Sequence, residues 1–134
     1  MSAGILHRHH KTLLAISTEV NTDQTGDTKE ILPAHGDSAN DTAQGFQVHF
    51  LLGQTGGATS PTSILKLQTS VNGTNWVDVV SSTQLTTDGV LTETKDISSP
   101  LLKYVRVVSE LGGGTKPSHS GSASLVSNAG FKLV

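Results

Sequence analysis

The chain of 134 residues contains no cysteine. This absence excludes disulfide bonds, thiolate metal sites and cysteine nucleophiles. No apolar run approaches the roughly 20 residues that a membrane-spanning helix requires, and residues 1–16 lack the apolar stretch and cleavage site of a secretory signal. We therefore expect a soluble chain without a secretory signal.

Charged side chains are also scarce. Asp, Glu, Lys and Arg make up 15% of the residues, and the net charge is −2 with an isoelectric point near 6.3. This balance offers no basic field for nucleic acid and no polybasic surface for an anionic membrane. Helices usually expose Glu, Lys and Arg, whereas Ser, Thr and Gly suit short strands and turns. The composition therefore predicts an all-β protein.

Aromatic residues account for only 4% of the chain, with a single tryptophan, Trp76, and a single tyrosine, Tyr104. A carbohydrate-binding module uses exposed aromatic rings as platforms for sugars, and this supply is small for that purpose. We predict instead that Trp76, next to a hairpin turn, is an anchor in the core or at a subunit interface.

The clearest local pattern spans residues 65–80 and predicts a β-hairpin. Apolar and polar residues alternate over residues 65–71, as in a strand with one buried face. Asn72 and Gly73 tolerate positive φ and are typical of a two-residue hairpin turn. Residues 76–80 are predicted to form the returning strand.

Similar alternation predicts further strands. In residues 44–52, Phe46, Val48, Phe50 and Leu52 should face the core. The other expected strands span residues 11–17, 30–32, 90–97, 101–111, 118–126 and 131–134. Seven to nine short strands in a chain of this length predict a single-domain antiparallel β-sandwich, for which jelly-roll and immunoglobulin-like connectivity both fit.

The N-terminus is predicted to be an extended arm of residues 1–11, ahead of a sandwich domain of residues 12–134. Such an arm can be ordered on a neighbouring subunit, where its apolar residues find a partner surface. The interface residues that we predict from the arm and from the hairpin are Ile5, Leu6, His7, Arg8, His9, His10 and Trp76.

The histidines of the arm are also candidates for a metal site, because an i, i+2 pair in an extended segment shares one face. They have no nearby carboxylate or fixed supporting residues, so we interpret them as arm contacts and predict no metal. Oxygen-rich loops bind calcium, and a polar loop carries Asp23, Asp27, Asp37 and Asp41. Their spacing matches no calcium motif, which favours turn formation and leaves a loop calcium site as the alternative.

Motifs for catalysis are missing. No Gly-x-Ser-x-Gly elbow is present, and nothing pairs two of the carboxylates Glu19, Glu30, Glu93 and Glu110 as acid and base. Residues 112–114 are three glycines, but a proline follows closely and opposes the helix that would complete a phosphate site. We predict that the chain is not an enzyme and uses no cofactor.

Two segments together resemble a known family. Residues 67–79, with the hairpin sequence Asn-Gly-Thr-Asn-Trp, and residues 103–108, Lys-Tyr-Val-Arg-Val-Val, precede a small-residue loop and strand. This order, which covers about the C-terminal half, resembles the small β-sandwich virion proteins of tailed bacteriophages. The resemblance implies a non-catalytic structural protein of a virion, such as a capsid decoration, auxiliary or head-spike protein. Its expected partners are copies of itself and other virion proteins, assembled in the host cytoplasm.

The alternative function is a carbohydrate-binding or host-surface-binding module. In that case a glycan would bind at the exposed loops of residues 53–61 and 112–117, with Trp76 as the aromatic contact.

Overall fold

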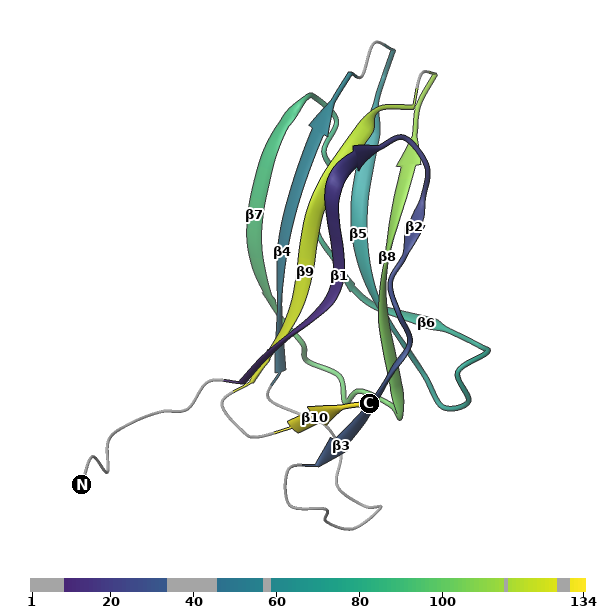
Figure 1. Cartoon of the computed structure of the whole chain (residues 1–134), viewed down its shortest axis with the longest axis vertical. Helices are drawn as coiled ribbons and strands as arrows, with labels where there is room; N and C mark the ends of the chain where they lie inside the picture. Colours follow the sequence, from purple (N-terminus) through teal and green to yellow (C-terminus); the bar gives the residue numbers. More distant parts are fainter. Residues whose placement is uncertain (1–8, 34–45, 57–58, 115, 128–130) are drawn as a thin grey trace, which may run out of the picture.

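A computed structural model describes residues 9–33, 46–56, 59–114, 116–127 and 131–134 of the chain (Figure 1). These residues contain ten strands and no helix, and so none that could span a membrane. The strands are β1 (His9–Val20), β2 (Gln24–Thr25), β3 (Lys29–Pro33), β4 (Phe46–Thr55), β5 (Thr62–Ser70), β6 (Val77–Ser81), β7 (Gly89–Asp96), β8 (Tyr104–Gly112), β9 (Ser118–Ser127) and β10 (Phe131–Leu133).

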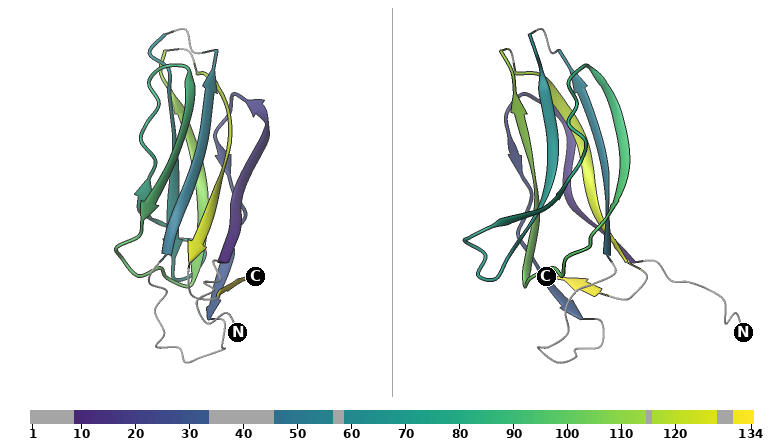
Figure 2. Two further views of the ribbon diagram at one scale, coloured as in Figure 1. Left: turned by 90° about the vertical axis from the view of Figure 1, so that its left-hand side faces the viewer. Right: turned by 180° about the vertical axis from the view of Figure 1, so that it is seen from behind.

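The strands form two antiparallel sheets that pack face to face (Figure 2). The four-stranded sheet has the order β1-β9-β4-β7, and the six-stranded sheet has the order β10-β3-β8-β5-β6 with β2 beside β8. The pairs β1–β9, β3–β8, β4–β7 and β5–β6 are nested within one another along the chain. This confirms the sandwich and identifies its connectivity as a jelly roll rather than an immunoglobulin-like Greek key.

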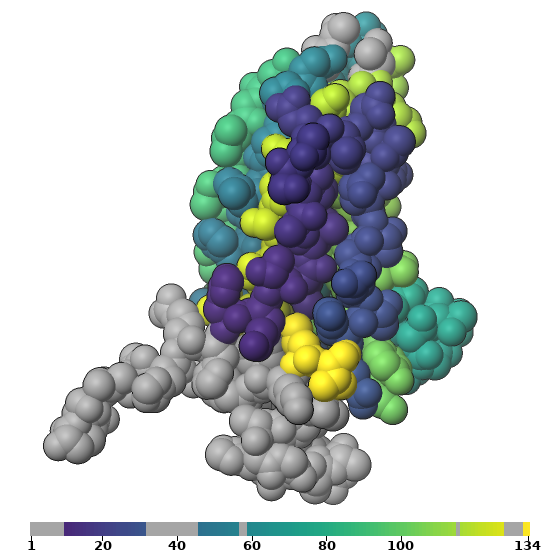
Figure 3. Space-filling model, in the orientation of Figure 1, coloured from purple at the N-terminus to yellow at the C-terminus, as the bar shows by residue number. Residues whose placement is uncertain are grey.

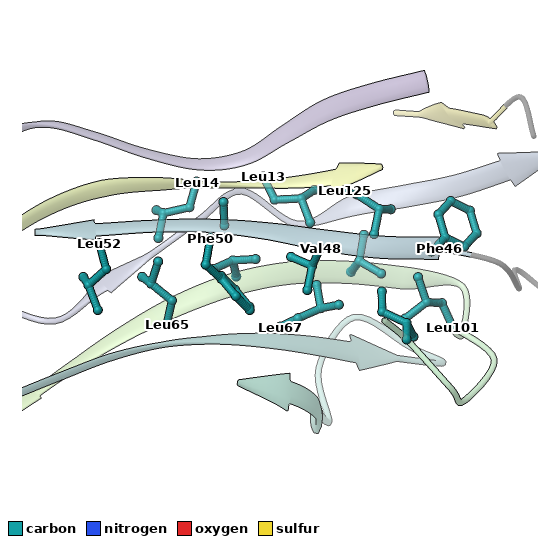
Figure 4. Close-up of a cluster of buried hydrophobic side chains, with 14 of the residues drawn as sticks. Leu13, Leu14, Phe46, Val48, Phe50, Leu52, Leu65, Leu67, Leu101 and Leu125 are labelled. Carbon is teal, nitrogen blue, oxygen red and sulfur yellow. The ribbon is translucent and has the colours of Figure 1, made fainter. Parts of the chain in front are cut away.

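The core lies between the two sheets. Phe46, Val48, Phe50 and Leu52 of β4 are all buried, which confirms the sequence prediction. They face the leucines of β5 across the sandwich (Figure 4). Fully burying each such side chain contributes about 1.5–3 kcal/mol relative to its exposed state, so the apolar alternation of β4 stabilises the packing of one sheet on the other.

The β5–β6 hairpin forms, but its predicted two-residue turn is wrong. The strands are joined by a loop of residues 71–76, so Trp76 precedes β6 instead of starting it. The hydroxyl of Ser70 accepts hydrogen bonds from the backbone N–H groups of Asn72 and Gly73, at 3.2 and 2.9 Å. The Asn72 side chain accepts two more from residues 74 and 75. These side-chain acceptors satisfy backbone donors locally and so stabilise a wider loop.

The first strand is longer than the predicted residues 11–17. β1 begins at His9, and His9, His10 and Lys11 pair with Ser127, Val126 and Leu125 of β9. The last three residues of the expected arm therefore belong to the four-stranded sheet, because β9 offers them backbone partners. Residues 1–8 of the arm lie outside the described residues.

One side of the sandwich is closed by the segment that leads from β1 to β3 (Figure 3). Gly26 lies between β2 and β3 in this segment, and its N–H donates to the carbonyl of Val107 of β8 at 2.8 Å. A Cβ at this position would collide with the carbonyl oxygen of Leu13 and lie 2.9 Å from that of Val107. Only glycine allows this close approach of β1 to β8.

Candidate functional site

The structure separates the predicted interface residues. Ile5, Leu6, His7 and Arg8 lie outside the described residues, and His9 is known only by its place in β1. His10 is exposed on the edge of the four-stranded sheet.

Trp76 belongs to the other sheet. It is half-buried, and its ring packs against the six-stranded sheet. His10 and Trp76 therefore do not form one site.

Trp76 makes its main contact with an arginine of β8. The guanidinium carbon of Arg106 lies 4.3 Å from the centre of the Trp76 ring, a cation–π arrangement. Arg106 Nε donates a hydrogen bond to Gln68 Oε1 at 2.8 Å, and Gln68 Nε2 donates to Asp78 Oδ1 at 2.8 Å. Because Gln68 is in register with both Asp78 and Arg106, the three side chains form one row across β6, β5 and β8.

A lysine extends this row. Lys66 Nζ lies 2.9 Å from Glu110 Oε1 and 3.9 Å from Asp78 Oδ2. The hydrogen bond with Glu110 raises the pKa of Lys66 above its ordinary value, and the charges of Glu110 and Asp78 act in the same direction against the effect of burial. Lys66 is therefore a protonated partner for both carboxylates.

Tyr104 lies beside Arg106 on the same outer face, two residues earlier in β8. Lys103 Nζ is 5.3 Å from the centre of its ring, and a Cβ on Gly73 would be 3.8 Å from the ring edge. Gly73 has a φ of +76°, so the 71–76 loop turns back over this face. We call Trp76, Tyr104, Arg106 and Gln68 the aromatic face.

The residue types of the aromatic face are those of binding hot spots. Tryptophan, tyrosine and arginine are the three side chains most enriched where truncation weakens protein–protein binding. The face holds the only tryptophan and the only tyrosine of the chain. Two of the three phenylalanines, Phe46 and Phe50, are buried in the core.

A second polar group, which the sequence reasoning missed, lies inside the sandwich. His119 is fully buried, and its Nδ1 is 2.9 Å from the carbonyl oxygen of Val20. That carbonyl requires an N–H at Nδ1, so Nε2 accepts from the hydroxyl of Ser109 at 2.7 Å. The Ser109 hydroxyl in turn accepts from the backbone N–H of Gln24 at 2.9 Å.

This serine–histidine pair links the sheets and does not resemble a catalytic pair. Ser109 is 1% exposed, and the third partner is a backbone carbonyl instead of a carboxylate. Beside it, the Ser63 hydroxyl donates to Gln54 Oε1 at 2.6 Å across the same interior. Both bonds join the four-stranded sheet to the six-stranded sheet.

The carboxylates considered for catalysis lie apart. Glu19 accepts from the Thr55 hydroxyl at 3.1 Å, Glu30 lies 3.8 Å from Lys103, and Glu110 pairs with Lys66. Each belongs to a different strand and has a local partner.

The candidate calcium loop is only partly described. Asp23 accepts from the backbone N–H of Leu111 at 2.8 Å, so its carboxylate holds the chain locally. Asp37 and Asp41 lie outside the described residues. Within the described ranges, no group of three or more His, Asp or Glu side chains could hold a metal ion.

The two loops of the glycan hypothesis do meet. Gly114 N–H donates to the carbonyl of Thr59 at 3.0 Å. Both loops lie at the end of the sandwich where β5 begins, whereas Trp76 follows the other end of β5, and nine strand residues at about 3.3 Å each separate the two ends. The loops and the tryptophan therefore do not form one sugar site.

No protein-family model matches the chain, and no match was found among curated proteins or solved structures. The aromatic face is therefore identified by its geometry and residue types alone.

Proposed function

We propose that the chain is a non-enzymatic structural protein that acts through protein–protein assembly contacts, as a component of a phage or phage-like virion. The aromatic face is the observation that carries this proposal. Trp76, Tyr104 and Arg106 lie together on the outside of one sheet, where hot-spot side chains stabilise an interface if a partner covers them.

The virion context rests on the resemblance of residues 67–79 and 103–108 to small phage sandwich proteins. The jelly-roll connectivity is consistent with it, because this fold occurs in viral capsid domains. It also occurs in lectin domains, so the fold is an analogy and does not by itself assign a function.

The edge strands of both sheets have features that oppose pairing with another chain, which favours a partner contact through the outer face of a sheet. On the edge strand β7, Glu93 and Lys95 are in register with the core residues Phe50 and Val48, so both charges are on the inward side. The edge strand β1 has two register shifts and β6 has one, while β10 has three residues. Inward charges, bulges and short edge strands all oppose strand addition. The proposed contact therefore uses the aromatic face.

A glycan-binding module is the second candidate, because the 53–61 and 112–117 loops contact each other at one end of the sandwich. Trp76 is a weaker sugar platform than expected, since Arg106 covers one face of its ring.

The test is the mass of the purified chain in solution, measured by sedimentation over a range of concentrations. We expect a homo-oligomer, and Trp76→Ala should raise its dissociation constant about 30-fold, as for a hot-spot residue. His49→Ala is the matched control, because His49 is exposed on the outer face of the other sheet. Circular dichroism checks that each variant folds.

A chain that stays monomeric at all concentrations would contradict assembly through the aromatic face. Glycan-array binding that Trp76→Ala abolishes without unfolding would instead support the second candidate. Mass spectrometry of purified particles from the producing host tests the virion assignment.

A further inference from the structure

Arg106 is held in place but has no carboxylate partner among the described residues. Its Nε is used by Gln68 and one side of its guanidinium by Trp76. The described structure gives it no ion pair, whereas Lys66, Lys95 and Lys103 each lie next to a carboxylate. A fixed guanidinium whose Nη donors have no hydrogen-bond partner among the described residues is arranged to bind a carboxylate in a two-pronged geometry.

A carboxylate without a partner among the described residues lies on the neighbouring segment. The residue before Asp27 donates its N–H to the carbonyl of Val107, and Lys29 is paired with Val105. Asp27 and Thr28 therefore both lie opposite Arg106 in the strand register, because this stretch has one residue more than the facing strand. Asp27 is exposed and has no hydrogen bond or ion pair within the described ranges.

Two lysines of the same sheet are paired with carboxylates, whereas Lys29 has no ion pair among the described residues. Lys66 pairs with Glu110 and Asp78, and Lys103 pairs with Glu30. Arg106 and Asp27 are thus an arginine and an aspartate side by side, and neither is in an ion pair with another residue that the structure describes.

We propose that the aromatic face binds a second copy of this chain about a two-fold axis, with Arg106 of each copy paired to Asp27 of the other. This inference depends on the proposed assembly function and names its partner. In a two-fold contact, if residue i meets residue j of the partner, then j also meets i. Adjacent strands are about 4.8 Å apart, so Arg106 and Asp27 of one copy are close together and both ion pairs lie near the axis. The four side chains around the axis then alternate in the sign of their charge. Trp76 and Tyr104 pack around them and exclude water.

Charge reversal in separate copies tests the contact. Arg106→Glu alone places a carboxylate against the Asp27 carboxylate of the other copy, and Asp27→Lys alone places an ammonium group against the Arg106 guanidinium. Each single variant should raise the dissociation constant of the homodimer about 30-fold or more, since a like-charge contact replaces an interface ion pair.

In an equimolar mixture of the two variants, one contact of the heterodimer joins the unchanged Asp27 of one copy to the unchanged Arg106 of the other. The second contact joins the two substituted side chains, which also have opposite charges. We expect the mixture to form a heterodimer within about threefold of the wild-type affinity, measured by sedimentation. Recovery in the mixture requires a contact between copies, because an ion pair within one chain cannot be repaired by a second chain.

The controls make the same charge changes on the other sheet. Lys11→Glu and Asp96→Lys alter exposed residues of β1 and β7, and both should leave the affinity unchanged. Arg106→Glu also removes the contact with Trp76, so Asp27→Lys, at an exposed position, is the variant with less risk to folding.

The outcomes separate the two proposals. If the wild type forms an oligomer that Trp76→Ala weakens, but the mixture does not recover, the Arg106–Asp27 pairing is wrong and the assembly face stands. If the wild type is monomeric, both proposals fail.

Discussion

The outer faces of the two sheets differ in chemistry. Along β9, in the interior of the four-stranded sheet, one of the five outward residues is Val126, and the other four have short hydroxyl side chains: Ser118, Ser120, Ser122 and Ser124. The six-stranded sheet instead carries Trp76, Tyr104 and Arg106 together with the Lys66 ion pairs. Small side chains bury little area when covered, whereas large rigid ones bury much and lose little entropy. This difference is the reason for placing the proposed partner contact on the six-stranded sheet.

The largest expected effect is on the stability of the fold and comes from a substitution of Gly26, which lies close to the backbone of both sheets. Gly26→Val should lower the free energy of unfolding by about 3 kcal/mol, because its Cβ collides with backbone carbonyls of both sheets. Urea denaturation measures the change. Gly53→Ala is the control, since a Cβ there would come no closer than 3.4 Å to any atom. Equal losses in the two variants would contradict the account of Gly26.

A second, smaller effect compares one polar pair from each face. A double-mutant cycle on Trp76 and Arg106 should give a coupling of about 1 kcal/mol, as for a half-buried cation–π pair. The pair of His49 and Thr94, 2.9 Å apart and exposed on the four-stranded sheet, should give about 0.3 kcal/mol. Both cycles use thermal unfolding at low protein concentration. Equal couplings would contradict the proposed difference between the faces.

The smallest effect is a pH dependence where the chain crosses between the sheets. Hydrogen bonds from Thr83, its hydroxyl first, and the charge of Lys95 lower the pKa of Glu93 below its ordinary value of 4.5, against the effect of burial. A lowered pKa in the folded state means that the stabilisation is complete above 4.5 and is lost as the pH falls through the lowered pKa. Glu93→Gln should therefore be less stable than the wild type at about pH 7.

The difference between Glu93→Gln and the wild type should shrink at about pH 3, measured by urea midpoints. The variant cannot lose a charge at this position, so its own midpoint falls less with acid. A difference that stays constant over this pH range would show that Glu93 does not contribute through its ionised form.

Alternation along the chain was enough to predict most strands and core positions. Phe46 to Leu52 at every second residue, and Ala123 and Leu125 in β9, are buried as expected. The same alternation places Tyr104 and Arg106 on one outer face. It also places His119 on the inward side of β9 with Ala123. The burial of His119 could therefore be predicted from alternation, although a histidine is not an expected core residue.

Contacts between distant residues could not be predicted in this way. The nested strand order depends on which strands pair with each other. The alternation of apolar and polar residues within each strand would be the same for any pairing, so it does not predict the order. Trp76 meets Arg106 because the Ser70 and Asn72 side chains widen the hairpin loop. A two-residue turn would have kept the tryptophan in the strand, so the expected turn gives no indication of the contact between Trp76 and Arg106.

The nested strand order has a consequence for synthesis of the chain on the ribosome. β9 lies between β1 and β4 in the four-stranded sheet, yet it is the last long strand to be made. Until it emerges, β1 and β4 each lack a neighbour, and their apolar residues are exposed to other nascent chains. Completion of this sheet therefore waits until β9, residues 118–127, has been made. A chain interrupted before residue 118 has no way to complete this sheet and is a substrate for chaperones or proteases.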